Sequence, residues 1–254
     1  MKTSNKLLIA AGVFLLACLV GYDFTLKTEY DKGAYKSRFY QMTALKFTNF
    51  KIINHKAGNC LGLRVEQGDN YGVWVSNNYK DMVEITQNGQ TLTIKYSGKD
   101  FYNLGDYSGI IITCPVLNEL TAMPALIPKI SDYGYDGNIE IEGFKQTVPM
   151  TLKSNQSINF TMDYNSLSEL NVSMGNNVYA PGRYYDRANN LIAVNGKPQL
   201  YIGSSNSIKV ANLNMQGGSQ LNLQGPVIGK PNYQLADNAT ITLSGSSLKL
   251  VQPK

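Results

Sequence analysis

The feature that most constrains this chain is an apolar–polar–apolar triplet that recurs after residue 40. Side chains alternate between the two faces of a β-strand, so each triplet buries one face and exposes the other. No window after residue 40 has the apolar period of 3.6 that a helix packed on a core needs. The triplets are Leu63-Arg64-Val65, Val73-Trp74-Val75, Leu92-Thr93-Ile94, Ile139-Glu140-Ile141, Ile158-Asn159-Phe160, Leu170-Asn171-Val172, Leu200-Tyr201-Ile202, Ile208-Lys209-Val210, Leu213-Asn214-Met215, Leu221-Asn222-Leu223, Ile241-Thr242-Leu243 and Leu248-Lys249-Leu250. They predict a continuous all-β domain over residues 39–254.

The spacing of the triplets narrows the fold class further. Gly, Asn, Asp and Ser clusters separate them, and these residues reach positive φ at low cost. Between residues 155 and 250 the triplets follow at short steps, which is typical of a β-solenoid, β-helix or prism built from stacked rungs. Outward Asn, Ser and Thr would then form side-chain ladders between rungs. An antiparallel sandwich is the alternative, because it gives similar triplets. The predicted turns are Asn88-Gly89, Asp136-Gly137-Asn138, Gly175-Asn176-Asn177, Asn195-Gly196 and Gly217-Gly218-Ser219.

The N-terminus is strongly apolar. A cationic start over residues 1–6 precedes residues 7–22, which carry no charge. This run is short for a full span, which needs about 20 residues, but it suits a slightly short anchor or a signal-peptide core. We predict an uncleaved signal-anchor helix over residues 1–24, a stalk over 25–38 that Gly33 interrupts, and a head over 39–254.

This assignment places the protein in the cell membrane as a single-pass chain with its head in the periplasm. Lys27, Lys32, Lys36 and Arg38 lie on the far side of the membrane, which the positive-inside rule disfavours. A cleaved signal peptide, a lipoprotein acylated at Cys18 and a buried helix remain alternatives. The membrane is the expected partner of the helix, and an envelope protein or a glycan that of the head.

Composition and charge argue against several function classes. The net charge is +5, yet no segment concentrates Lys and Arg as a nucleic-acid surface would, so we expect no nucleic-acid partner. The only histidine, His55, follows a strand and is interpreted as a structural loop residue. One histidine excludes most His-based catalysis and His-rich metal sites. Phosphate-binding, dinucleotide-binding, Cys-x-x-Cys and His-Glu-x-x-His motifs do not occur, so we expect no cofactor, no metal and no catalytic residues.

The acidic residues between Asp132 and Glu142 form the densest carboxylate cluster. The segment departs from the EF-hand pattern at Gly134 and Gly143, where that pattern has ligands. Glu140 and Glu142 alternate on one strand face and are the candidates for a carbohydrate-active enzyme. Their alternative interpretation is a solvated strand face.

Tyrosines and cysteines supply the remaining candidate sites. Tyrosine gives a flat amphipathic contact at low entropic cost, and several of the 17 tyrosines fall in loops. The best candidate for a binding patch is Arg183, Tyr184, Tyr185 and Arg187, although Tyr also suits a strand face. Cys60 and Cys114 would form a disulfide if the head is exported, or else pack as two small buried residues.

The strand pattern also resembles a known family. The segments that carry the resemblance are residues 47–53 (FTNFKII), 63–68 (LRVEQG), 73–76 (VWVS), 82–85 (MVEI), 92–94 (LTI) and 110–117 (IIITCPVL). Over roughly residues 45–250 the chain resembles the head GIN domain family of auto-transporter adhesins, and its anchor and stalk look like a branch found in Bacteroidetes. The family's Ser-Gly-Ser-Gly turns are reduced here to Gly203-Ser204-Ser205 and Ser244-Gly245-Ser246-Ser247.

The resemblance implies an exported β-helical head with no established molecular activity, and it transfers no catalytic residue. Together with the apolar leader it predicts a non-catalytic, membrane-anchored head that acts in adhesin-like interaction or in envelope structure. A glycan-binding module and a carbohydrate-active enzyme on a β-helix are the alternatives.

Overall fold

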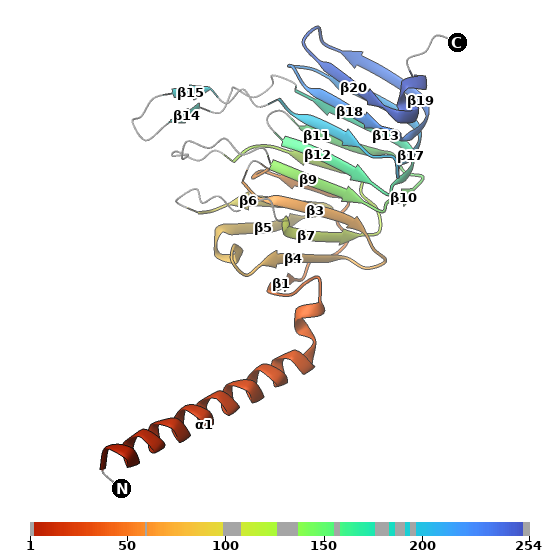
Figure 1. The fold of residues 1–254 in the computed structure, drawn as a ribbon. Helices are drawn as coiled ribbons and strands as arrows, with labels where there is room; N and C mark the ends of the chain where they lie inside the picture. Colours follow the sequence, from red (N-terminus) through yellow and green to blue (C-terminus); the bar gives the residue numbers. More distant parts are fainter. Residues whose placement is uncertain are drawn as a thin grey trace. The chain divides into compact units, whose positions relative to one another are not determined.

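The computed structural model describes residues 3–58, 60–98, 108–125, 137–154, 158–175, 183–185, 191–193 and 197–250 (Figure 1). The chain divides into two units, Met1–Met42 and Thr43–Lys254. The first unit is mainly helical and the second is built from strands. An all-β head preceded by one N-terminal helix is therefore confirmed.

Helix α1 (Thr3–Lys32) dominates the first unit, and none of its residues is buried. The helix does not end at residue 24, where we placed the end of the anchor, but continues to Lys32 without a break. Gly33 ends it at a φ of 64°, a left-handed conformation that glycine adopts easily. The short 3₁₀ helix η1 (Ala34–Lys36) follows.

The strands of the second unit form two large sheets within the described residues. The first sheet contains β1 (Met42–Leu45), β3 (Gly62–Gln67), β4 (Gly72–Ser76), β7 (Ser108–Cys114), β9 (Gly137–Glu142), β12 (Ile158–Asp163), β16 (Gln199–Ile202), β18 (Gln220–Gln224) and β20 (Thr240–Ser244). The second contains β2 (Ile52–His55), β5 (Val83–Asn88), β6 (Thr91–Tyr96), β8 (Glu119–Ala122), β10 (Lys145–Gln146), β11 (Met150–Ser154), β13 (Ser166–Met174), β17 (Ser207–Met215) and β19 (Val227–Leu235). A separate small pair joins β14 (Arg183–Tyr185) to β15 (Leu191–Ala193).

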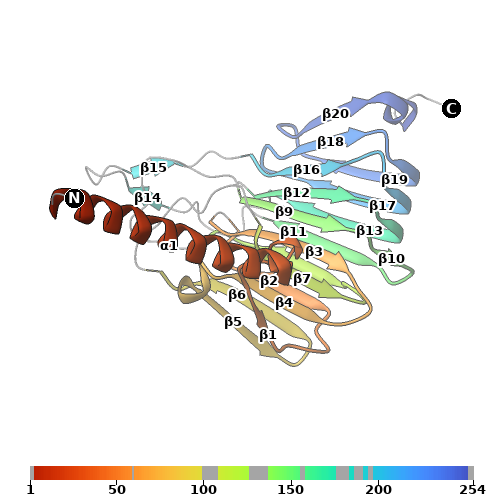
Figure 2. The same cartoon turned by 60° about the horizontal axis from the view of Figure 1, so that its bottom comes forward.

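Neighbouring strands in the two large sheets pair mostly in parallel. The antiparallel exceptions among the described pairs are β4 with β7 and β5 with β6. From β7 onward the chain alternates between the two large sheets, apart from β10 and β11, which both pair with β13, and the separate pair of β14 and β15. Each pass therefore adds to both sheets. In Figure 2 the strands β3, β9, β12, β16, β18 and β20 follow one another across the first sheet. An antiparallel sandwich, the alternative from sequence, is wrong for this head.

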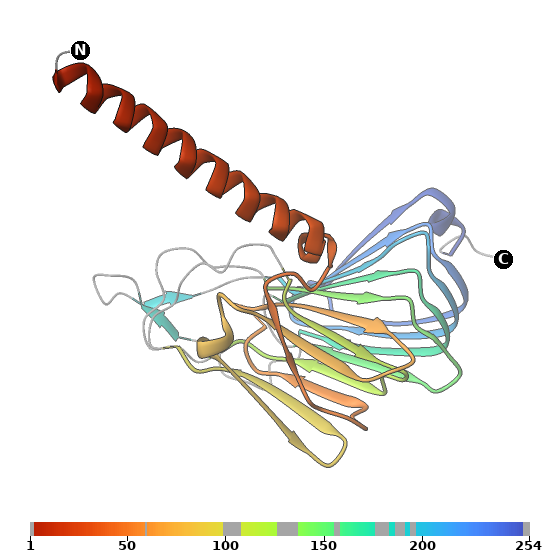
Figure 3. The same ribbon diagram turned by 90° about the horizontal axis from the view of Figure 1, so that it is seen from below.

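The order of the strands in space departs from the order in the chain near the start of the head. In the first sheet β3 lies between β7 and β9, and in the second sheet β2 lies between β6 and β8. Although β6 and β7 come later in the chain than β2 and β3, they therefore lie nearer the edges of the two sheets that β5 and β1 form. The hairpin of β5 and β6, yellow in Figure 3, extends this end of the second sheet.

The inward side chains of both sheets form one apolar core. Residues in register on neighbouring strands stack in columns, such as Ile53, Leu120 and Leu152, all of which are fully buried. The same holds in the first sheet for Phe160, Leu200 and Leu221. Parallel, in-register stacking therefore converts the sequence triplets into continuous buried strips.

Buried asparagines stabilise the bends between the sheets. Asn165 donates from Nδ2 to the Ile141 carbonyl at 3.0 Å and to Asn206 Oδ1 at 2.9 Å, and its Oδ1 accepts the Phe144 N–H at 3.0 Å. Asn206 repeats the arrangement one pass later, donating to the Met162 and Gly203 carbonyls. These side chains satisfy backbone groups that leave the strand ladders at the bend.

Three local predictions need correction. The triplet Leu248-Lys249-Leu250 lies in the 3₁₀ helix η3 (Gly245–Leu250), because the Ser247 hydroxyl bonds the Gly225 N–H and fixes a bend there. The triplets at residues 208 and 213 belong to one strand, β17. Residues 137 and 138 of a predicted turn open strand β9, because Asn138 pairs in register with Asn159. The turns at Asn88-Gly89 and Gly217-Gly218 are confirmed, and a second 3₁₀ helix, η2 (Lys80–Met82), precedes β5.

Candidate functional site

The predicted tyrosine patch falls at the edge of the described residues. Arg183, Tyr184 and Tyr185 form β14 and pair in antiparallel register with Ala193, Ile192 and Leu191. Arg187, the fourth member of the patch, lies outside the described residues, as do residues 132–136 of the acidic cluster.

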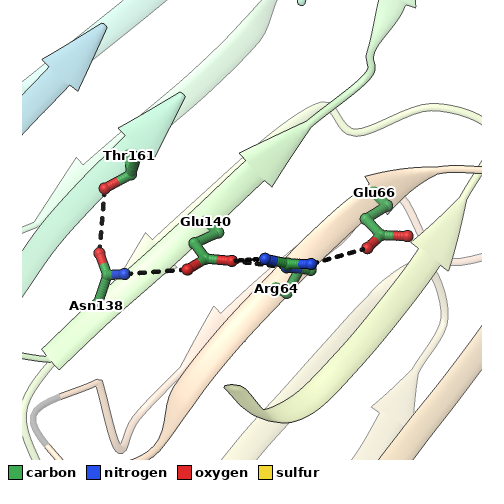
Figure 4. Close-up of polar contacts among 5 residues, drawn as sticks. All are labelled: Arg64, Glu66, Asn138, Glu140 and Thr161. Atoms are coloured by element: carbon green, nitrogen blue, oxygen red, sulfur yellow. Dashed lines mark hydrogen bonds and ion pairs between the residues drawn. The ribbon is translucent and has the colours of Figure 1, made fainter. Parts of the chain in front are cut away.

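Glu140 belongs to a line of polar side chains on the outer face of the first sheet (Figure 4). Its Oε2 accepts a hydrogen bond of 2.6 Å from Arg64 Nε, and Arg64 Nη2 lies 2.5 Å from the same oxygen. Its Oε1 accepts from Asn138 Nδ2 at 3.3 Å, and Asn138 Oδ1 accepts from Thr161 Oγ1 at 3.1 Å. The carboxylate is therefore engaged on both oxygens by a cation and an amide.

Glu142 lies in the neighbouring register column, which is acidic over three strands. Register pairs it with Glu66 on β3 and with Asp163 on β12. Asp163 accepts from Ser205 Oγ at 2.9 Å, and Glu66 lies 3.9 Å from Arg64. Within the described ranges, no three His, Cys, Asp or Glu side chains group so as to hold a metal ion.

Arg64 is the positive charge that this acidic face shares. Partial burial lowers the pKa of its guanidinium, but the hydrogen bond that it donates to Glu140 and the charges of Glu140, Glu142 and Glu66 outweigh this effect, so the pKa is raised overall. The arrangement is that of a charge-compensated strand face. It holds the Arg64 guanidinium between the carboxylates of Glu140 and Glu66.

His55 is a buried residue at the end of β2 and not the loop residue expected from sequence. Its side chain is fully buried, and its Nε2 lies 2.9 Å from the Leu61 carbonyl, which places the proton on that nitrogen. Its Nδ1 is buried and has no hydrogen-bond partner among the described residues. Burial lowers the pKa of the imidazole to about 4, against a smaller opposite effect of the Leu61 hydrogen bond, so the ring is neutral at pH 7.

Cys60 and Cys114 are free thiols in the structure, which corrects the predicted disulfide. Both are buried, and the Cys60 thiol contacts the Ala57 carbonyl at 3.4 Å. Burial raises the pKa of each thiol to about 12. The alternative interpretation, two small residues packed in the core, describes them.

The outer face of the second sheet carries a groove of about 330 Å³ over β11, β13, β17 and β19. Two register columns line it. The first column runs across all four strands and consists of Thr151, Asn171, Asn212 and Asn232. The second runs across the last three strands and consists of Ser173, Asn214 and Gln234. The groove was not predicted, because a sequence does not show which outward residues share a register.

Asparagine amides connect the strands beneath the groove. Asn232 Nδ2 donates to Asn212 Oδ1 at 2.7 Å, and Asn212 Nδ2 donates to Asn171 Oδ1 at 2.8 Å. Asn171 in turn donates to Glu169 Oε1 at 3.0 Å. This is the outward ladder that the abundance of asparagine predicts, and it fixes the orientation of each carboxamide.

The chain is weakly similar to several solved structures. No family model and no curated protein matches it. A "putative adhesin" from Bacteroides fragilis is 13% identical with a TM-score of 0.37, and the match covers 79% of this chain and 94% of that one. A "putative lipid binding protein" from Parabacteroides distasonis is 17% identical with a TM-score of 0.28, over 80% and 96% of the two chains. A "putative adhesin" from Parabacteroides merdae is 13% identical with a TM-score of 0.24, over 79% and 94%.

Proposed function

We propose that this protein is a non-catalytic, adhesin-like head that α1 holds at the cell membrane, with the head in the periplasm. The head interacts with an envelope protein or a glycan, or has a structural role in the envelope. The observation that carries the proposal is the exposure of the apolar helix, in a chain whose head buries its own apolar residues.

The exposure of α1 supports the tether. An 18-residue window of the helix has a mean hydropathy of 2.2, and none of it is buried. Leu8, Phe14 and Leu16 expose 75%, 72% and 64% of their surface. A helix whose apolar residues are exposed on all sides suits a hydrocarbon environment. A signal sequence at the N-terminus has the same character, and Cys18 within the run is the residue that a lipoprotein would acylate.

The charge pattern on the outer strand faces supports a role without catalysis. Glu140 is ion-paired with Arg64, and His55 is buried and neutral, so neither is free to exchange a proton with a substrate. A carbohydrate-active enzyme needs two carboxyl groups that flank a bound sugar. Here the outward carboxylates lie side by side in register on one strand face.

The order of the strands supports a finer assignment of the fold. We assign the head as an open β-solenoid of two sheets, related to the prism, in which each pass adds one strand to each sheet. The strand pattern over residues 45–250 supports membership of the head GIN domain family of auto-transporter adhesins.

Fractionation of cells that express the full chain tests the tether. We expect the chain in the membrane fraction after an alkaline wash, with the intact mass of 28.0 kDa. Arginine in place of Leu15 and Leu16 should release it, because each charge in a span costs about 3 kcal/mol. Arginine in place of Thr28 is the control and should leave it bound. A soluble chain that lacks its first residues, or one that starts at an acylated Cys18, contradicts the uncleaved anchor.

Turnover assays test the absence of catalysis. The full chain is incubated with a panel of polysaccharides, and reducing ends are measured. We expect no release above background for the wild type or for Glu140→Gln. Release by the wild type that Glu140→Gln or Glu142→Gln abolishes would establish the enzyme alternative.

A further inference from the structure

We infer that the groove over β11, β13, β17 and β19 is a binding site for an extended neutral glycan, a chain of uncharged sugars whose hydroxyls face the amides. The inference rests on the proposed function and adds the ligand class and its location. It is carried by the groove, by the chemistry of its lining and by donor and acceptor groups of Asn214, Thr151 and Gln234 that the described part of the chain leaves unengaged.

Among the described residues, the lining of the groove is uncharged: it consists of the polar residues of the two columns and of the apolar Val172 and Leu213. The polar side chains are carboxamides and hydroxyls, and each of these groups both donates and accepts hydrogen bonds. Sugar hydroxyls have the same dual character, so they match such a lining in either direction. An anionic ligand would find no cation in the lining, and an apolar one would strip water from the amides without replacing its hydrogen bonds.

The charges beside the groove have partners on the protein or lie at its margin. Lys153, in register with Ser173, pairs with Glu119 at 2.8 Å. Glu169 accepts hydrogen bonds from the amides of Asn171 and Asn212. Lys230 lies at the exposed edge strand β19, outside the lining. The interior of the groove is therefore electrically neutral.

The ladder leaves several lining groups for a ligand. The amides of Asn171 and Asn212 are engaged along the column, which holds them in place. Asn214 uses its Oδ1 to accept from Gln216 at 2.8 Å, so its Nδ2 remains for a ligand. Thr151 and Gln234 make no side-chain hydrogen bond to the described part of the chain. Fixed neighbours with unengaged ends are the preorganised polar groups that a binding site needs.

The direction of the columns fits an extended chain. Both columns run across the strands, and neighbouring strands of a sheet lie about 4.8 Å apart. Each strand thus offers a fresh pair of polar groups at a repeat comparable to the length that one sugar adds to its chain. The volume of about 330 Å³ lies at the small end of ligand sites, which suits a short stretch of a longer chain.

Binding of immobilised polysaccharides by the full chain in nanodiscs tests the inference. The neutral probes are dextran, laminarin and mannan, and the anionic probes are polygalacturonate and heparin. We expect binding to at least one neutral probe and none to the anionic ones. Asn214→Leu should weaken that binding at least about tenfold, since it removes hydrogen bonds at the centre of the groove.

Asn222→Leu is the matched control. Asn222 is also a half-buried, outward asparagine on an interior strand, but it lies on β18 in the other sheet. It should bind as the wild type does, and circular dichroism of both variants checks that the head stays folded. A second variant, Gln234→Ala at the exposed end of the groove, should weaken binding without touching the ladder.

Several results would overturn the inference. They are the absence of binding to every neutral probe, equal binding by Asn214→Leu and Asn222→Leu, and preference for the anionic probes or for an unfolded polypeptide. Such a failure leaves the membrane tether intact, because retention in the membrane fraction is measured separately. Loss of the tether with retained glycan binding would overturn only the proposed anchor.

Discussion

The two ends of the head are built by different rules. In the C-terminal half, from β11 to β20, the strands of the two large sheets alternate between them and join them in chain order, with β14 and β15 as a separate pair. In the N-terminal half, β6 and β7 lie outside β2 and β3, β4 pairs antiparallel with β7, and β5 pairs antiparallel with β6. The regular half adds passes to an existing template, whereas the irregular half has to close an end.

The difference teaches where sequence periodicity is informative. In the regular half each strand contacts the strands of the previous and next pass, so a short step in the sequence becomes a neighbour in space. In the irregular half, β3 contacts β7 and β9 at long sequence separation. The buried strip is continuous in both halves, but only in the regular half does the order of the strands in the sequence predict their order in the sheets.

The largest expected effect comes from the strand that joins the two halves. Leu120 on β8 is fully buried and stacks between Ile53 and Leu152. Leu120→Ala should lower the free energy of unfolding by about 2–5 kcal/mol, whereas Leu243→Ala on the terminal strand β20 should cost about 1 kcal/mol. Urea unfolding of both variants measures this. Equal losses would show that the terminal pass is packed as tightly as the junction.

We expect a residue of the N-terminal half, His55, to lower the stability of the fold at acid pH. The folded pKa of His55 is about 4, below its usual 6.5, so only the unfolded chain takes up the proton between these values. The contribution of His55 to the free energy of unfolding is complete above about pH 6.5. About 3 kcal/mol of it is lost as the pH falls toward 4.

The test compares urea unfolding of the wild type and His55→Gln at pH 7 and pH 4. The variant lacks the titrating ring, so its stability should depend less on pH by that amount. An unchanged pH dependence would mean that the imidazole is protonated in the folded head.

Bends of the two halves should tolerate a methyl group differently. Gly175 has a φ of 75°, and a Cβ there would fall inside contact distance of the Gln216 carbonyl. Gly89, in the hairpin of β5 and β6, has a φ of 57° and open space around it. Gly175→Ala should cost more than about 2 kcal/mol and Gly89→Ala about 1 kcal/mol, as thermal unfolding would show. A larger loss for Gly89→Ala than for Gly175→Ala would show that the bend at Gly175 is not the tighter of the two.

The smallest effect is expected from the ion pair of the acidic face. Arg64 and Glu140 are partly exposed, so Glu140→Gln should cost less than about 1 kcal/mol, and the loss should shrink in high salt. Unfolding at low and high ionic strength measures this, with Glu119→Gln, which breaks the Lys153 pair, as the comparison. A loss of several kcal/mol at either site would show that the ion pair stabilises the fold more than exposed ion pairs do.

Much of the fold follows from local patterns, and little of the candidate site does. The triplet at Leu63 and the turn at Asn88-Gly89 are correct, because alternation and turn preference are short-range properties. The triplet at Leu248 is wrong, because the Ser247–Gly225 hydrogen bond overrides its alternation. The Glu140–Glu142 face was recognised, but its partner Arg64 lies 76 residues away and carries no local signal.

The sequence by itself determined an apolar N-terminal helix and a head of alternating strands, since both depend on the order of apolar and polar residues over a few positions. Only the tertiary structure decided the insertion of β6 and β7, the buried state of His55 and the register that aligns Asn171, Asn212 and Asn232. Register and burial depend on contacts between strands far apart in the chain. A groove made by such contacts exists only once the strands are stacked.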